Sequence, residues 1–62
     1  MTMREYYNMS MKDSIALRNK VVTLGKFLRR EFIPEYYRHA NVFKYENNVY
    51  YVDREIGIID IK

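Results

Sequence analysis

The sequence predicts a small α+β domain in which one amphipathic helix is followed by an antiparallel sheet, and three observations lead to this fold class. Apolar residues with helical spacing occupy the first half of the chain, and two runs of alternating polarity occupy the second half. A pair of asparagines, which favour tight turns, separates those two runs. The chain has 62 residues, which form a single domain over 1–62 near the lower size limit for an independent core.

The predicted helix covers 11–32. Ser10 is placed to cap it through the backbone N–H of Asp13, whose charge suits the positive end of the helix dipole. The helix ends before Pro34, because proline disfavours helical backbone at the preceding residue. Five apolar residues at steps of three or four form one stripe toward the core: Leu17, Val21, Leu24, Leu28 and Phe32.

Gly25 is the weak point of this helix, because glycine costs about 1 kcal/mol relative to alanine in a helix interior. Two explanations fit it: the close approach of a strand backbone, or a break into two shorter helices. The apolar stripe keeps its phase through Gly25, so the sequence favours a continuous helix. Pro34 then predicts a short second helix over 34–40, since proline is favoured at the first helical position.

A hairpin follows, with strands over 42–46 and 49–53 on either side of the turn Asn47-Asn48. A two-residue turn there brings one set of side chains to the face that packs on the helix. That set is wholly apolar or aromatic: Phe43, Tyr45, Tyr50 and Val52.

A third strand over 56–61 extends the hairpin to a three-stranded meander. The length of the loop before it decides which isoleucines face the core. A two-residue loop turns Ile59 and Ile61 inward, whereas a three-residue loop turns Ile56 and Ile58 inward.

The side chains that enzymes and metal sites depend on are scarce. The chain has one histidine and no cysteine, and its two glycines form no phosphate-binding loop. Asp53, Glu55 and Asp60 cluster around the last predicted turn, where acidic residues are more typical of solvation than of metal binding. A domain of this size also has little room to enclose a substrate. We therefore expect a non-enzymatic protein without a catalytic, cofactor or metal site and without a small-molecule substrate.

No apolar run approaches the roughly 20 residues that cross a bilayer, and the segment after Met1 lacks the apolar stretch of a signal peptide. We therefore expect an intracellular, cytoplasmic protein without a membrane partner. Its small size suits a viral accessory protein.

The second face of the predicted sheet is more apolar than a solvated face should be. Exposed apolar patches on small proteins often mark interaction surfaces. The leading hypothesis is therefore a regulator or inhibitor that docks through this face on a larger protein, or on a second copy as a homodimer. The alternative is that the N-terminal segment, with Tyr6 and Tyr7, covers the face within the molecule. The predicted interface residues are Val49, Tyr51, Ile56 and Ile58.

Positive charge is concentrated in the first half of the chain. Residues 1–33 carry seven Lys and Arg against three Asp and Glu (+4), whereas 34–62 carry four against five (−1). On the predicted helix Lys12, Lys26 and Arg30 lie opposite the apolar stripe, and Arg18 and Arg29 flank them. These cations either form an ordinary solvated face or follow phosphates. The alternative function is thus a basic nucleic-acid-binding module or a subunit of a nucleoprotein assembly. Its candidate contacts are Lys12, Lys26, Arg29, Arg30 and Arg38.

Overall fold

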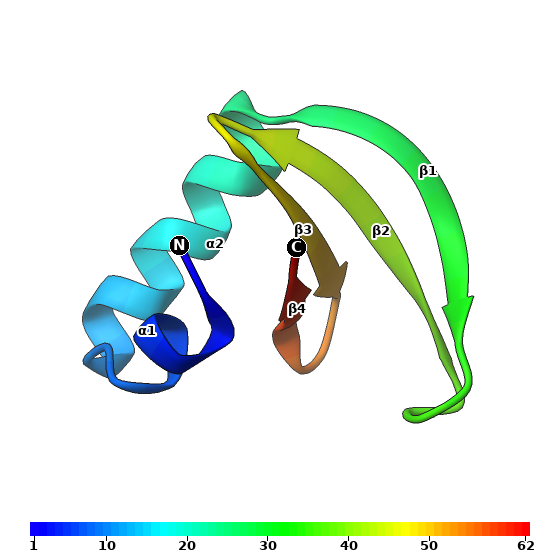
Figure 1. Ribbon diagram of the computed structural model, residues 1–62, viewed down its shortest axis with the longest axis horizontal. Coiled ribbons are helices and arrows are strands. Elements are labelled where there is room, and N and C mark those ends of the chain that lie inside the picture. Colours follow the sequence, from blue (N-terminus) through cyan, green and yellow to red (C-terminus); the bar gives the residue numbers. More distant parts are fainter.

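The computed structural model describes all 62 residues and consists of two helices followed by one four-stranded antiparallel sheet (Figure 1). The strands lie side by side in chain order, so each neighbouring pair is a hairpin. The predicted α+β class is confirmed, and the sheet has one strand more than the predicted meander. The elements are α1 (Met3–Tyr7), α2 (Met11–Leu24), β1 (Lys26–Ile33), β2 (Arg38–Tyr45), β3 (Asn48–Asp53) and β4 (Gly57–Ile61).

Helix α1 was not anticipated from the sequence. The Thr2 hydroxyl accepts a hydrogen bond from the backbone N–H of Glu5, and the Glu5 carboxylate accepts one from the N–H of Thr2 at 2.8 Å. This reciprocal capping box is written in the sequence as Thr-x-x-Glu. The side chain of Asn48 also bonds to the amino group and carbonyl of Met1, which fastens the N-terminus to the start of β3.

Helix α2 begins as predicted, but its continuation to residue 32 is wrong. The Ser10 hydroxyl accepts the N–H of Asp13 at 3.1 Å, whereas the other end of the helix lies at Leu24. Gly25 follows in extended conformation, with φ −72° and ψ 163°. The helix therefore neither continues through Gly25 nor resumes after it.

The reason is the crowding around Gly25. A Cβ atom there would meet the carbonyl oxygen of Val21 and would lie 3.2 Å from that of Lys44. The chain can turn directly from α2 into β1 beside the β2 backbone only without a side chain at this position. The close approach of a strand, considered from the sequence, is present, but it occurs at the end of a helix.

Strand β1 replaces the last two turns of the predicted helix. Leu28 and Phe32 fit both structures, because residues four apart share a face in a strand as well as in a helix. Both side chains are exposed on β1, and Leu24 is 68% exposed at the end of α2. Of the predicted stripe, only Leu17 and the fully buried Val21 pack in the core.

The short helix predicted over 34–40 is also wrong, because a reverse turn connects β1 to β2. The N–H groups of Tyr36 and Tyr37 donate to the carbonyls of Ile33 and Pro34, both at 3.1 Å. Tyr37 then takes the left-handed region, with φ 54°, and the chain reverses. Proline presets φ for a reverse turn as well as for a first helical turn, so the signal was ambiguous.

The β2–β3 hairpin has the predicted core face with a different register. Tyr45 pairs with Asn48, so the two turn residues are Glu46 and Asn47 rather than Asn47 and Asn48. Each residue of β3 therefore pairs two positions earlier along β2 than predicted. A shift of two residues leaves every side chain on the same face. We call this face the helix face; it carries Phe43, Tyr45, Tyr50 and Val52 toward α2.

Strand β4 contains an irregularity in its pairing with β3, and this irregularity decides which isoleucines face the core. Val52 pairs with Ile58 and Tyr51 with Asp60, so Ile59 is an extra residue. Ile58 and Ile61 consequently face α2, while Ile59 turns to the opposite side. Each of the two loop lengths considered from the sequence had placed one of these two isoleucines in the core.

Two apolar clusters lie on opposite sides of the sheet. The main cluster, between the helices and the helix face, contains Val21, Phe43, Tyr50, Val52, Ile58 and Ile61, with Met3, Tyr6, Leu17 and Tyr45 packed against it. The far-face cluster contains Ala40, Val42, Tyr51 and Ile59, with Ile33 and Val49 at its margin.

The far-face cluster is covered by the sheet itself. Figure 1 shows β1 and β2 as strongly bent strands, and residues of both outer strands, β1 and β4, line one groove on this face. As a result Tyr51 is only 5% exposed. The intramolecular cover considered for the N-terminal segment is present only in part: Tyr6 packs against the main cluster, which holds Ile58, and lines a cavity with Ile56, whereas Tyr7 is exposed. The N-terminal segment does not pack against the far-face cluster.

Candidate functional site

The four residues predicted as a partner interface do not form one surface. Tyr51 and the half-buried Val49 belong to the far-face cluster, whereas Ile58 is 3% exposed in the main cluster on the other side of the sheet. Ile56 is 50% exposed in the β3–β4 turn, where it borders a small cavity with Ile15. A partner therefore has access to Ile56 but not to Ile58.

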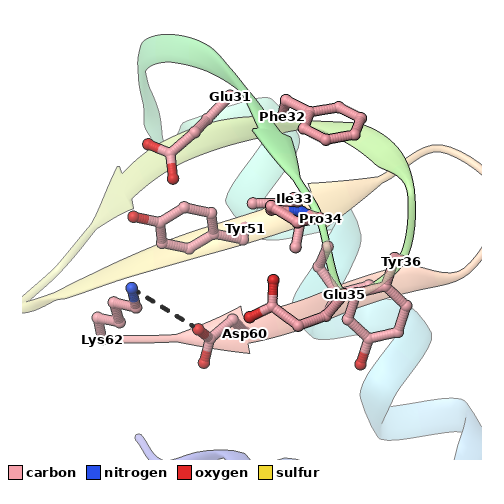
Figure 2. Close-up of a pocket in the computed structure, with 10 residues that line it drawn as sticks. Glu31, Phe32, Ile33, Pro34, Glu35, Tyr36, Tyr51, Asp60 and Lys62 are labelled. Atoms are coloured by element: carbon pink, nitrogen blue, oxygen red, sulfur yellow. Dashed lines mark ion pairs between the residues drawn. The ribbon is translucent and has the colours of Figure 1, made fainter.

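The largest cavity is a groove of about 560 Å³ on the far face (Figure 2), which we call the far-face groove. Its walls come from β1, the β1–β2 turn, β3 and β4, with the Tyr51 ring between them. Two cations hold that ring. The Arg29 guanidinium donates to the Tyr51 hydroxyl at 3.2 Å, and the Lys62 ammonium lies 5.1 Å from the ring centre.

The polar lining of the far-face groove is mainly acidic. Glu31, Glu35 and Asp60 supply carboxylates. Glu31 accepts a hydrogen bond from Arg29 at 2.9 Å, which raises the pKa of that guanidinium, and Asp60 lies 4.0 Å from Lys62. The groove thus combines tyrosine and apolar walls with partly neutralised carboxylates.

The five predicted nucleic-acid contacts are spread over three elements, because the helix stops at Leu24. Lys12 lies at the start of α2, Lys26, Arg29 and Arg30 lie on β1, and Arg38 begins β2. Two of them are engaged within the molecule. Arg29 pairs with Glu31, and Arg38 lies 3.4 Å from Asp53 and 3.5 Å from Glu55.

Arg30 instead belongs to a cationic groove that the sequence did not reveal. A cavity of about 270 Å³ between α2 and the sheet is lined by Arg18 and Arg54, and an adjoining cavity of about 240 Å³ is lined by Arg30 and Arg54. The two cavities share Asn41, Val52 and Arg54. We call their combined surface the arginine groove.

The arginine groove has no acidic lining residue. None of Arg18, Arg30 and Arg54 takes part in an ion pair within 4.0 Å. The other polar side chains that line it are uncharged amides, a hydroxyl and an imidazole: Asn19, Asn41, Thr23 and His39. Its three guanidinium groups are therefore available to an anion.

Local structure places each arginine. Arg30 pairs with Asn41 across β1 and β2, on the same side of the sheet as α2. Arg54 follows the buried Asp53, whose carboxylate accepts the backbone N–H groups of Glu55 and Ile56, both at 2.9 Å. These bonds, with Arg38 beside them, lower the pKa of Asp53 and fix the turn that carries Arg54.

An aromatic group continues the arginine groove toward the β1–β2 turn. Phe32 pairs with His39, and their rings lie 5.1 Å apart, centre to centre. The Tyr37 ring lies 5.7 Å from that of Phe32. Phe32 also borders the far-face groove, but Figure 2 shows its ring turned away from Tyr51. We call Phe32, Tyr37 and His39 the aromatic platform.

Sequence reasoning found Arg30 but missed Arg54 and the platform as parts of one site. These residues come from β1, β2 and two turns, so only the pairing of β1 with β2 and of β2 with β3 brings them together. The one available signal was the spacing of Arg30 and Phe32. Residues two apart lie on the same face of a strand but not on the same face of a helix.

Comparison of the chain with protein-family models, with curated proteins and with solved structures finds no match. Neither helix has the length and apolar character needed to cross a membrane. No three acidic or histidine side chains converge on a point suited to a metal ion. The function is therefore inferred from the two grooves and their side chains.

Proposed function

We propose that the protein binds nucleic acid and that the arginine groove contacts the sugar–phosphate backbone. The observation that carries this proposal is the convergence of Arg18, Arg30 and Arg54, from three separate elements, on one groove without a carboxylate partner. A guanidinium keeps its charge at every physiological pH, and its planar donors match phosphate oxygens in pairs.

The distribution of charge over the molecule supports an anionic ligand. Arg29 and Arg38, elsewhere on the sheet, each have a carboxylate partner. The groove arginines have none, and like charges that lie close together repel unless an anion neutralises them. The acidic lining lies in the far-face groove instead, on the opposite side of the sheet. A polyanion is therefore attracted more strongly to the arginine groove than to the far-face groove, where carboxylates and cations are paired.

Binding of labelled oligonucleotides by fluorescence anisotropy tests the proposal. Wild-type protein should bind an oligonucleotide of about 16 nucleotides at low salt and release it as the salt concentration rises. The reason is that phosphate contacts release counterions from the nucleic acid, and added salt opposes that release. The double variant Arg30→Glu/Arg54→Glu should bind at least about tenfold more weakly, with a flatter salt dependence.

The matched control is Lys20→Glu/Lys44→Glu, which changes the net charge equally at two exposed positions outside the arginine groove. It should weaken binding by less than about threefold, through the general field alone. No binding at low salt, or an equal loss in both double variants, would overturn the proposal.

Docking on a larger protein, as a regulator or inhibitor, is a second proposal. It is supported by the open far-face groove, which the half-exposed Tyr36 and the ring of Tyr51 both line. Tyrosine combines contact area with a polar tip, which suits such surfaces. Tyr36→Ala should then reduce recovery of a co-purifying protein in nuclease-treated lysate, whereas Arg30→Glu/Arg54→Glu should not.

A further inference from the structure

We propose that the aromatic platform stacks unpaired bases, so that the protein prefers single-stranded over duplex nucleic acid. This inference rests on the proposed function, because the arginine groove must first hold the backbone. It adds the class of nucleic acid and assigns a role to Phe32, Tyr37 and His39.

The platform is accessible. Phe32 is 42% exposed and Tyr37 is 85% exposed, and neither belongs to the main cluster or to the far-face cluster. Their rings meet nearly edge to face, at an interplanar angle of 79°. Such packing orients the rings, and part of the surface of both stays open to solvent.

Apart from its contact with Phe32, the Tyr37 side chain contributes little to the stability of the fold. Its backbone lies in the left-handed region, with φ 54°, where glycine or asparagine is normally found. A tyrosine there is strained, and because its side chain stays exposed it gains little from burial. A large aromatic ring at such a position is better accounted for by a ligand.

The platform and the arginine groove form one continuous surface. Arg30 and Phe32 are two residues apart on β1 and therefore share a face of the sheet. His39 belongs to both, since it lines the groove beside Arg30 and its ring contacts Phe32. A strand whose phosphates contact the arginines thus has its next bases beside the rings.

Only a single strand fits this arrangement. In a duplex the bases are stacked on each other and their faces are covered, whereas unstacked bases present faces that aromatic side chains can contact. Such stacking tolerates any sequence, because every base has an aromatic face. The expected ligand is therefore single-stranded RNA or DNA of mixed sequence.

Tyr37→Gly is the informative variant, because it removes the ring and also relieves the backbone strain. The full chain is titrated with a labelled single strand, with the duplex of the same sequence, and with a strand of abasic sites. Tyr37→Gly should bind the single strand about tenfold more weakly, while its duplex affinity and its melting temperature do not fall. Wild-type protein should bind the abasic strand at least as weakly as Tyr37→Gly binds the normal strand, because the abasic strand can stack on none of the three rings.

Two further variants keep the test specific. Phe32→Leu retains apolar bulk without an aromatic face and should also weaken single-strand binding. Tyr36→Ala removes the neighbouring tyrosine, which lines the far-face groove, and should leave binding unchanged.

The outcomes separate this inference from the proposed function. Binding that requires Arg30 and Arg54 but ignores Tyr37, or that favours the duplex, would overturn the inference alone. Absence of binding to all three probes at low salt would overturn the proposed function and the inference together.

Discussion

Asp53 shows how one side chain can organise a turn. Its carboxylate is buried and accepts two backbone N–H groups at 2.9 Å, from Glu55 and Ile56, together with the Arg38 guanidinium at 3.4 Å. From the sequence, Asp53 was interpreted as one of three solvating acids around a turn. An aspartate that opens a turn closed by a glycine was the stronger signal, because its side chain can bond to the backbone that follows. Gly57, with φ 99°, completes that turn.

The pKa of Asp53 predicts an acid-sensitive fold. The hydrogen bonds hold this pKa below its ordinary value of 3.8, so the stability they provide is fully present above that value. It is lost as the pH falls through the lower pKa of the folded state. The free energy of unfolding, measured with urea over a pH series, should therefore be flat near neutrality and fall below about pH 4.

Asp53→Ala should lower the free energy of unfolding at pH 7 by about 2 kcal/mol and should remove part of its decline in acid. Glu55→Ala is the matched control, because this carboxylate of the same turn is exposed and pairs with Arg38 at the surface. It should change the free energy by less than about 1 kcal/mol. Equal effects of the two variants would contradict the role assigned to Asp53.

Among the elements, the hairpin of β2 and β3 could be predicted and β1 could not. Alternating polarity with period two fixes which side chains face the core. This assignment of faces is correct although the predicted pairing of β2 with β3 was wrong by two residues, because a shift of two keeps every side chain on its face. In β1 the apolar residues Leu28 and Phe32 are four apart, a spacing that helix and strand share. Nothing in the local pattern distinguished a helix from a strand here. The crowding that ends α2 at Gly25 depends in part on Lys44, far along the chain.

Gly25→Ala distinguishes these two structures by the sign of its effect. In a continuous helix alanine would stabilise the protein by about 1 kcal/mol. At the end of α2 the added Cβ meets the carbonyl oxygens of Val21 and Lys44, which are both backbone atoms and cannot rotate away. The free energy of unfolding should therefore fall by about 1–3 kcal/mol, the usual cost of overpacking. Chemical denaturation checks this, and an increase in stability would contradict the observed end of the helix.

The misassigned β1 is also the reason why the candidate site was only partly predicted. On a helix, Arg30 lies one turn from Lys26 in a basic strip; on a strand, it lies across from Asn41 and next to Phe32. Arg18 was noted as a flanking cation, but its proximity to Arg54 depends on how α2 packs across the helix face. A site assembled by tertiary packing has no continuous signature in the sequence.

At the scale of the whole molecule, one curled sheet gives a short chain two apolar clusters. The chain has no cysteine to cross-link it, and a domain of this size buries comparatively little surface. Curling lets the far face bury Tyr51 and Ile59 without a second layer of helices. Irregular pairing accompanies the curl in β1, after Phe27, and in β4, at Ile59. Bulges of this kind carry no clear sequence signal, so the apolar far face was interpreted as an interface.

The same architecture predicts opposite behaviour for two isoleucines that are two positions apart. Ile58 lies in the main cluster, whereas Ile56 stands half-exposed in the preceding turn. Ile58→Asp would bury an unpaired carboxylate and should abolish folding, because its cost of at least about 4 kcal/mol takes up most of the stability expected of a small domain. Ile56→Asp should leave the far-ultraviolet circular dichroism and the melting temperature nearly unchanged. A folded Ile58→Asp protein that had lost only its association with a partner would instead place Ile58 at an exposed interface, and the facing assigned to β4 would have to be reversed.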